Sequence, residues 1–313
     1  MSRNLPARFA RIIFVSAAAV LLAGATAAVA SSPPGGDFRS SPAVSLIDSA
    51  GPRCDPARAN FRLPFGFGFP AVPRITNRYL PLAPGTQFTL LGTTDSPSGP
   101  VEHRVVLTVT DLMKEIDGVK TLVLWDRDFS GGELVEEELA FLAQDGLGNV
   151  WNLGEYPEEH EDGRFIGAPN TWLSGVNDAV AGIHMLAIPG VGLPPYLQGF
   201  SPDIDFADCG QVVGSHQSIC VPVGCFSNVL VIEEWNAFEP AARQLKYYAP
   251  GVGNIRIGAV NDPEAETLLL TNVTRLSSTA LAQARQRALR LDARAYIVAG
   301  DVYGETPRAQ RLP

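Results

Sequence analysis

The sequence contains four cysteines whose spacing could support chemistry. Cys209, Cys220 and Cys225 lie within seventeen residues of one another, and Cys54 stands far upstream. Thiolates at short spacing either bind a metal or form disulfides. The spacings here are not Cys-x-x-Cys, and no His-x-x-His accompanies them. The pattern therefore favours disulfides over a metal or redox site.

Three disulfide pairings are possible for these four residues. Cys220 and Cys225 flank the predicted turn Val221-Pro222-Val223-Gly224, so they could face each other across the mouth of a hairpin. Cys54 with Cys209 would then join the N-terminal arm to the body of the protein. The sequence leaves the alternative pairings open.

Two groups of carboxylates could bind a cation. The first is Glu158, His160 and Asp162, and the second is Asp203, Asp205 and Asp208. The second group resembles part of a calcium loop but lacks the central glycine and the distal glutamate. Acidic runs of this kind are commonly solvated loops.

The sequence also lacks the serine-hydrolase, zinc-protease, P-loop and dinucleotide motifs. We therefore predict no catalytic residues and no cofactor, and we regard an enzyme as the less favoured interpretation.

Aromatic residues suggest a cavity for an apolar ligand. They fall on or beside predicted strands, where one face of a curved sheet can line a pocket. His184 lies between apolar residues in an irregular segment that could cover such a pocket. The candidate ligand-binding residues are Trp125, Trp151, Trp172, His184, Met185 and Tyr248. A plain hydrophobic core is the alternative interpretation.

The N-terminus has the three parts of a secretory signal peptide. Arg3, Arg8 and Arg11 precede an uncharged apolar run that ends in Ala28-Val29-Ala30. We expect cleavage near Ala30, a secreted or periplasmic location in a bacterium, and no stable membrane insertion afterwards. A retained anchor is the alternative.

Removal of the three arginines leaves 21 basic against 33 acidic residues, a formal charge of −12. This charge argues against nucleic acid and anionic membrane surfaces as partners, because both need basic surfaces on the protein.

Short apolar runs bounded by Gly, Asp, Asn or Pro follow one another from residue 86 to residue 274. Short turns between them predict antiparallel pairing, because parallel strands need long crossovers. We predict a mainly β fold with a curved antiparallel sheet or half-barrel, similar to lipocalins or lipoprotein carriers. A long irregular segment at 163–210 would cover the sheet. A helix capped by Ser277 or Ser278 would follow, because Leu281, Ala284, Ala288, Leu291 and Ala295 form an apolar stripe.

These features divide the chain into four parts. Residues 1–30 are the signal peptide, 31–60 a flexible arm, 61–276 the β domain and 277–313 the C-terminal helix and tail.

Several motifs resemble those of a family of exported bacterial β-rich proteins of unassigned function. The most specific is Lys246-Tyr247-Tyr248-Ala249-Pro250-Gly251-Val252-Gly253, and the others include Asn77-Arg78-Tyr79-Leu80-Pro81 and Gly148-Asn149-Val150-Trp151. The resemblance implies a β-rich exported domain and supplies no catalytic residues. The sequence therefore favours an exported protein that binds an apolar or lipid-like small molecule. A metal-assisted extracellular enzyme and a structural envelope protein are the alternatives.

Overall fold

The structure is a computed structural model that describes residue 54 and residues 68–96, 99–262 and 265–313. The predicted signal peptide lies outside the described residues, as does the arm at 31–60 apart from Cys54. None of the helices in the described part is long and apolar enough to cross a membrane.

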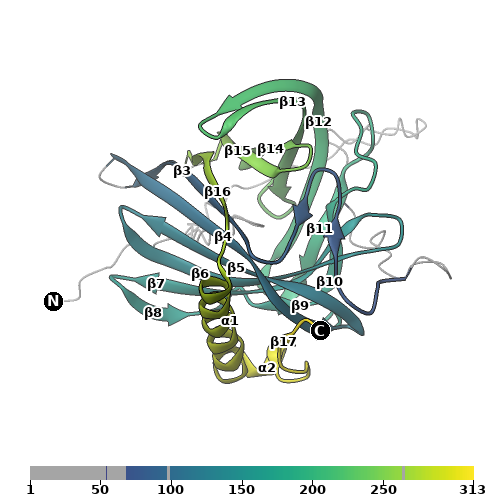
Figure 1. Ribbon diagram of the computed structural model, residues 1–313, viewed down its shortest axis with the longest axis vertical. Coiled ribbons are helices and arrows are strands. Elements are labelled where there is room, and N and C mark those ends of the chain that lie inside the picture. Colours follow the sequence, from purple (N-terminus) through teal and green to yellow (C-terminus); the bar gives the residue numbers. More distant parts are fainter. Residues whose placement is uncertain (1–53, 55–67, 97–98, 263–264) are drawn as a thin grey trace, which may run out of the picture.

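Twelve antiparallel strands of the described chain form a closed barrel (Figure 1). Each strand pairs with its neighbours, and β7 pairs with β10 to complete the ring. In order around the wall the strands are β3 (Thr86–Ser96), β4 (Gly99–Ile116), β5 (Val119–Ser130), β6 (Glu133–Gln144), β7 (Val150–Glu161), β10 (Val180–Met185), β11 (Tyr196–Ser201), β12 (Phe206–Val221), β13 (Gly224–Asn236), β14 (Arg243–Ala249), β15 (Gly253–Val260) and β16 (Thr267–Arg275). The prediction of a mainly β fold with antiparallel pairing is confirmed, and the curved sheet closes completely.

Tight turns at glycine explain why these strands pair in sequence. Gly131 and Gly132 join β5 to β6 with φ values of 60° and 87°, a backbone region that residues with side chains disfavour.

The segment at 163–210 is less irregular than its composition indicates. It contains β8 (Arg164–Gly167), β9 (Trp172–Leu173) and η2 (Pro202–Ile204) in addition to β10 and β11. Two of its short strands thus complete the barrel that the segment was expected to cover.

Helix α1 (Ser278–Val298) packs against the outer face of β4 and β6 (Figure 1). The Oγ of Ser277 accepts a hydrogen bond from the backbone N–H of Ala280 at 3.2 Å, as the predicted cap requires. Ala284, Ala288, Leu291 and Ala295 of the predicted stripe are buried. The chain ends with α2 (Gly300–Tyr303) and β17 (Gln310–Arg311), which pairs with β4.

The cysteines lie in the pairing that the hairpin argument indicates. Cys220 and Cys225 are opposite each other on β12 and β13 and form a disulfide. Cys54 is bonded to Cys209 of β12, with their Cα atoms 5.7 Å apart. The second bridge joins the N-terminal region to the barrel wall.

Candidate functional site

The barrel lumen is the candidate site, because alternate residues of the wall strands point into it. Leu122 and Leu124 of β5 belong to the inner hydrophobic cluster. Asp126 and Asp128 follow at the same alternation and are buried. The same alternation holds on β6. Leu142 and Ala140 belong to the inner cluster, and the next residues on that face are Glu138 and Glu136, which are also buried. The lumen therefore has an apolar half near the turn at residues 145–149 and a carboxyl-rich half near the turn at residues 131–132.

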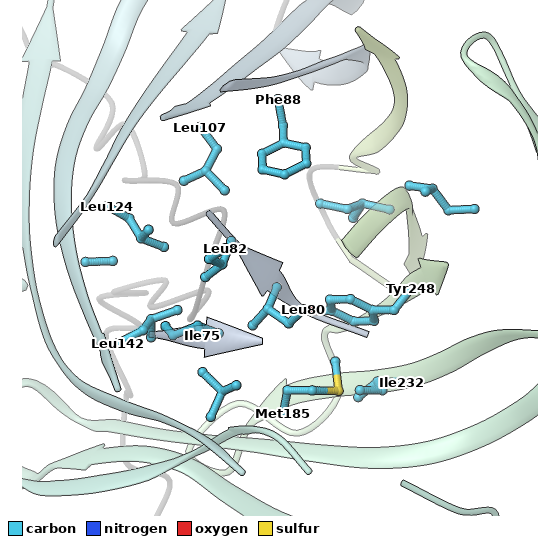
Figure 2. Packing of buried hydrophobic residues seen from close by; sticks show 14 of the residues in the cluster. Ile75, Leu80, Leu82, Phe88, Leu107, Leu124, Leu142, Met185, Ile232 and Tyr248 are labelled. Carbon is cyan, nitrogen blue, oxygen red and sulfur yellow. The ribbon is translucent and has the colours of Figure 1, made fainter. Parts of the chain in front are cut away.

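A short hairpin fills the apolar half. We call it the lumen hairpin. It consists of β1 (Ile75–Thr76) and β2 (Pro81–Leu82), which pair with each other in a sheet separate from the wall. Figure 2 shows Ile75, Leu80 and Leu82 of this hairpin among wall residues that include Leu107, Leu124 and Leu142. The chain itself therefore occupies the volume in which a ligand of an open barrel would lie.

A narrow apolar crevice separates the lumen hairpin from one side of the wall. Its volume is about 30 Å³. Typical small-molecule pockets are about 300–1,000 Å³, so the crevice takes a ligand only if the hairpin shifts. The lining residues are Leu80, Leu82, Phe88, Leu90, Val105, Leu107, Val252, Gly253, Asn254 and Ile257.

Polar contacts hold the lumen hairpin at one end. The Oε1 of Gln144 accepts hydrogen bonds from the backbone N–H groups of Thr76 at 2.7 Å and Asn77 at 2.8 Å. The side-chain Nδ2 of Asn77 donates to the carbonyls of Gly148 at 2.9 Å and Leu186 at 3.0 Å. Hydrogen bonds of side chains, rather than a strand ladder, thus fix this end of the hairpin.

Burial raises the pKa values of several acids in the carboxyl-rich half. Burial, with the neighbouring charges of Glu155 and Asp126, raises the pKa of Glu138 well above its ordinary value. Burial also raises the pKa of Asp126 to about 7 and the pKa of Glu155 to about 7. Glu138 is 1% exposed, and neither of its carboxyl oxygens has a hydrogen-bond partner among the described residues.

Two cations lie among these acids. His103 contacts Asp128 through Nε2, and its Nδ1 lies 3.0 Å from Oε1 of Glu266. Burial lowers the pKa of His103, but the hydrogen bonds and charges of the two acids outweigh it and raise the pKa to about 9. The Nζ of Lys246 lies 2.6 Å from Oε2 of Glu234. Burial lowers the pKa of Lys246 and the charge of Glu234 raises it, with a net increase.

Trp172 lies on β9, which pairs with β7, and belongs to the inner cluster. Its indole N–H donates to Oε2 of Glu155 at 3.1 Å, and its ring packs on Phe206 with centroids 5.0 Å apart. A Cβ on Gly199 would lie 2.9 Å from this ring, so only glycine fits beneath it. A second pocket of about 320 Å³ lies near Trp172, with walls from β9, η2 and α2.

The structure places the predicted ligand-binding residues on two sides of the sheet. Trp172, Met185 and Tyr248 belong to the inner cluster, and Figure 2 labels Met185 and Tyr248 among its residues. His184 is fully buried, and burial lowers its pKa to about 4. Trp125 and Trp151 belong to the outer cluster with α1. Their indole N–H groups donate to Glu137 and Asp145. Three of the six residues, Trp172, Met185 and Tyr248, therefore lie in the inner cluster.

The two acidic groups considered for a metal do not assemble a site. Glu158 accepts a hydrogen bond from Tyr156 at 2.7 Å and lies 3.1 Å from Arg294 of α1. His160 packs edge-on against Phe165. Asp208 is buried on β12, whereas Asp203 and Asp205 are exposed. The part of the chain that the structure describes contains no cluster of three or more His, Cys, Asp or Glu residues placed to bind a metal ion.

The carboxyl-rich half of the lumen is not among the sites predicted from the sequence. Its residues His103, Asp126, Glu136, Glu138 and Glu155 are not among the predicted candidates. A signal was present, because strand alternation puts Leu122, Leu124, Asp126 and Asp128 on one face.

Comparisons with known proteins give little further information. No family model matches the chain, and no curated protein matches it. Two solved structures are similar. One is a Bacteroides fragilis protein assigned as exported, with a YmcC-like fold, at 13% identity and a TM-score of 0.31. The other is a Parabacteroides distasonis protein assigned as a lipoprotein, at 12% identity and a TM-score of 0.30. Each similarity covers 63% of this chain and 99% of the other, and we base no inference on either.

Proposed function

We propose that this is an extracytoplasmic protein that binds an apolar, lipid-like small molecule in the apolar half of its barrel. The observation that carries the proposal is the crevice between the lumen hairpin and the wall. Eight of the ten lining residues carry apolar side chains, and the other two are Gly253 and Asn254. The signal-peptide pattern and the two disulfides support an oxidising compartment outside the cytoplasm.

The ligand would exchange places with part of the lumen hairpin. The hairpin makes no backbone ladder with the wall, so it can shift without breaking the barrel. Leu80 and Leu82 pack there as an acyl chain would, with the same aliphatic chemistry. Ligand binding is then weakened by the free energy needed to shift the hairpin, because only the shifted form is competent.

A fluorescent acyl probe such as cis-parinaric acid tests the proposal. The exported wild-type protein should take up the probe saturably. Leu82→Ala should tighten binding because it widens the crevice, whereas Leu139→Ala should leave it unchanged. Leu139 is a matched control, because it is equally buried but belongs to the outer cluster. Each substitution should cost about 2–5 kcal/mol of stability.

Asn77→Ala gives a second, independent variant. It removes the hydrogen bonds that join the lumen hairpin to Gly148 and Leu186 and should increase probe affinity. No saturable uptake by either the wild type or Asn77→Ala would contradict the proposal.

A further inference from the structure

The loop between β10 and β11 exposes aliphatic side chains to solvent. Residues 186–195 contain no Asp, Glu, Lys or Arg. Ile188 is 86% exposed, Val191 60% and Leu193 42%. Leu147, in the turn between β6 and β7, is 52% exposed. We call these four residues the apolar tip.

Hydrogen bonds join the two turns that carry the apolar tip. The backbone N–H of Ala187 donates to Oδ1 of Asn149 at 2.9 Å. The side chain of Asn77 donates to both Gly148 and Leu186, one residue in each turn. The two turns therefore lie side by side, and Asn77 bonds both of them to the lumen hairpin.

The apolar tip lies at the apolar end of the barrel. Val150 and Met185, which belong to the inner hydrophobic cluster, adjoin the two turns. The acids Asp126, Asp128, Glu136 and Glu138 lie toward the other end. The apolar tip thus lies at the same end of the barrel as the apolar half of the lumen.

The chemistry of the apolar tip fits a bilayer better than a protein partner. A stable protein interface needs about 20–30 residues on each side, and four protruding side chains supply far less. Aliphatic side chains gain free energy when they leave water for acyl chains, and basic residues beside them attract anionic headgroups. Arg74 and Arg78 of the segment around the lumen hairpin are exposed, and Arg78 adjoins Asn77.

We infer that the apolar tip docks this protein on an anionic phospholipid surface. The chain as a whole is acidic, but Arg74 and Arg78 supply local positive charge next to Asn77, which is bonded to both turns of the tip. Ile188 and Val191 would enter the acyl boundary, and Arg78 would meet lipid phosphates. The lumen would then open toward the source of an apolar ligand. This inference goes beyond the proposed function, because docking and ligand uptake are separate events.

Vesicle flotation tests the inference. The exported protein, with its N-terminus read by mass spectrometry, is mixed with vesicles of phosphatidylethanolamine and phosphatidylglycerol. The wild type should float, and the double variant Ile188→Asp/Val191→Asp should lower the partition coefficient by at least about tenfold. Ile297→Asp is the matched control. Ile297 lies on α1, is 85% exposed, and its substitution should leave flotation within about twofold.

Three results would overturn the inference. These are a wild type that does not float, a double variant that floats like the wild type, and a control that loses binding equally. Arg78→Gln should weaken flotation on the anionic vesicles and leave it unchanged on phosphatidylcholine vesicles. If Arg78→Gln floats on the anionic vesicles as well as the wild type does, the proposed contact of Arg78 with lipid phosphates is wrong. Uptake of the acyl probe in solution should be normal in the double variant, so failure of docking and failure of ligand binding are distinguishable.

Discussion

The Nζ of Lys246 lies 2.6 Å from Oε2 of Glu234, and both side chains are buried in the carboxyl-rich half of the lumen. Glu234 also accepts a hydrogen bond from Gln198 at 3.1 Å. Lys246 and Glu234 therefore form a buried ion pair beside acids whose pKa values burial raises. Removal of either partner would leave an uncompensated charge in a medium of low polarity.

The first prediction concerns this pair. Lys246→Met should destabilise the protein by about 3–5 kcal/mol, because Glu234 would be buried without a counter-charge. Arg243→Met is a matched control on the same two strands. Its pair with Glu233 spans 2.7 Å but is partly exposed, so the loss should be below about 1 kcal/mol. Urea unfolding measures both, and equal losses would contradict this assignment.

The second prediction concerns pH and the lumen acids. Burial raises the pKa values of Glu136 and Glu138 well above their ordinary value, and those of Asp126 and Glu155 to about 7. The folded state thus binds more protons than the unfolded state at intermediate pH. The free energy of unfolding should therefore fall as the pH rises from about 4 to about 7 and beyond.

Glu138→Gln isolates the contribution of Glu138 to the pH dependence of stability. The amide cannot ionise, so the loss of stability between pH 5 and pH 8 should be smaller than in the wild type. Glu133→Gln is the control, because Glu133 is exposed on the same strand. A wild type whose stability rises over this interval would refute the prediction.

The third prediction concerns His103. Asp128 and Glu266 raise its pKa to about 9, so the folded protein holds it protonated at neutral pH. Its contribution to stability is fully present below its unfolded pKa of about 6.5 and is lost as the pH rises through about 9. Titration of the ring by NMR should give a midpoint near 9. A midpoint near that of a free histidine would contradict the placement between two acids.

The fourth prediction compares the disulfides. Cys54–Cys209 spans 155 residues of sequence, and Cys220–Cys225 spans 5. In the chain-entropy account, replacing both cysteines by serine should cost about 5 kcal/mol for the first bridge and about 2 kcal/mol for the second. Thermal unfolding of the two double variants measures the order. A larger loss for the short bridge would show that local geometry outweighs chain entropy.

Much of the fold was predictable from local patterns. Alternation and glycine turns indicated antiparallel strands, and the stripe from Ala284 to Ala295 indicated an amphipathic helix. These patterns depend only on residues that are close in sequence, so they can be recognised in a single sequence. Closure of the barrel depends on β7 meeting β10, a contact between distant segments that strand patterns do not encode.

The polar lumen was harder to predict, because both faces of the sheet carry apolar residues. On β5, Leu124 faces the lumen and Val123 faces the outer cluster. The pattern alone therefore does not say which face is the inside. From the sequence alone, an acid such as Glu138 is interpreted as a solvent-exposed strand residue. It is buried only because the sheet closes into a barrel.

The most direct test of the proposed function is native mass spectrometry of the exported wild-type protein, compared with the same sample after extraction with organic solvent. The proposal predicts a protein that carries one apolar molecule, lost on extraction and regained when acyl lipid is added. A protein that has the mass of the bare chain before extraction and binds no acyl lipid afterwards would contradict it.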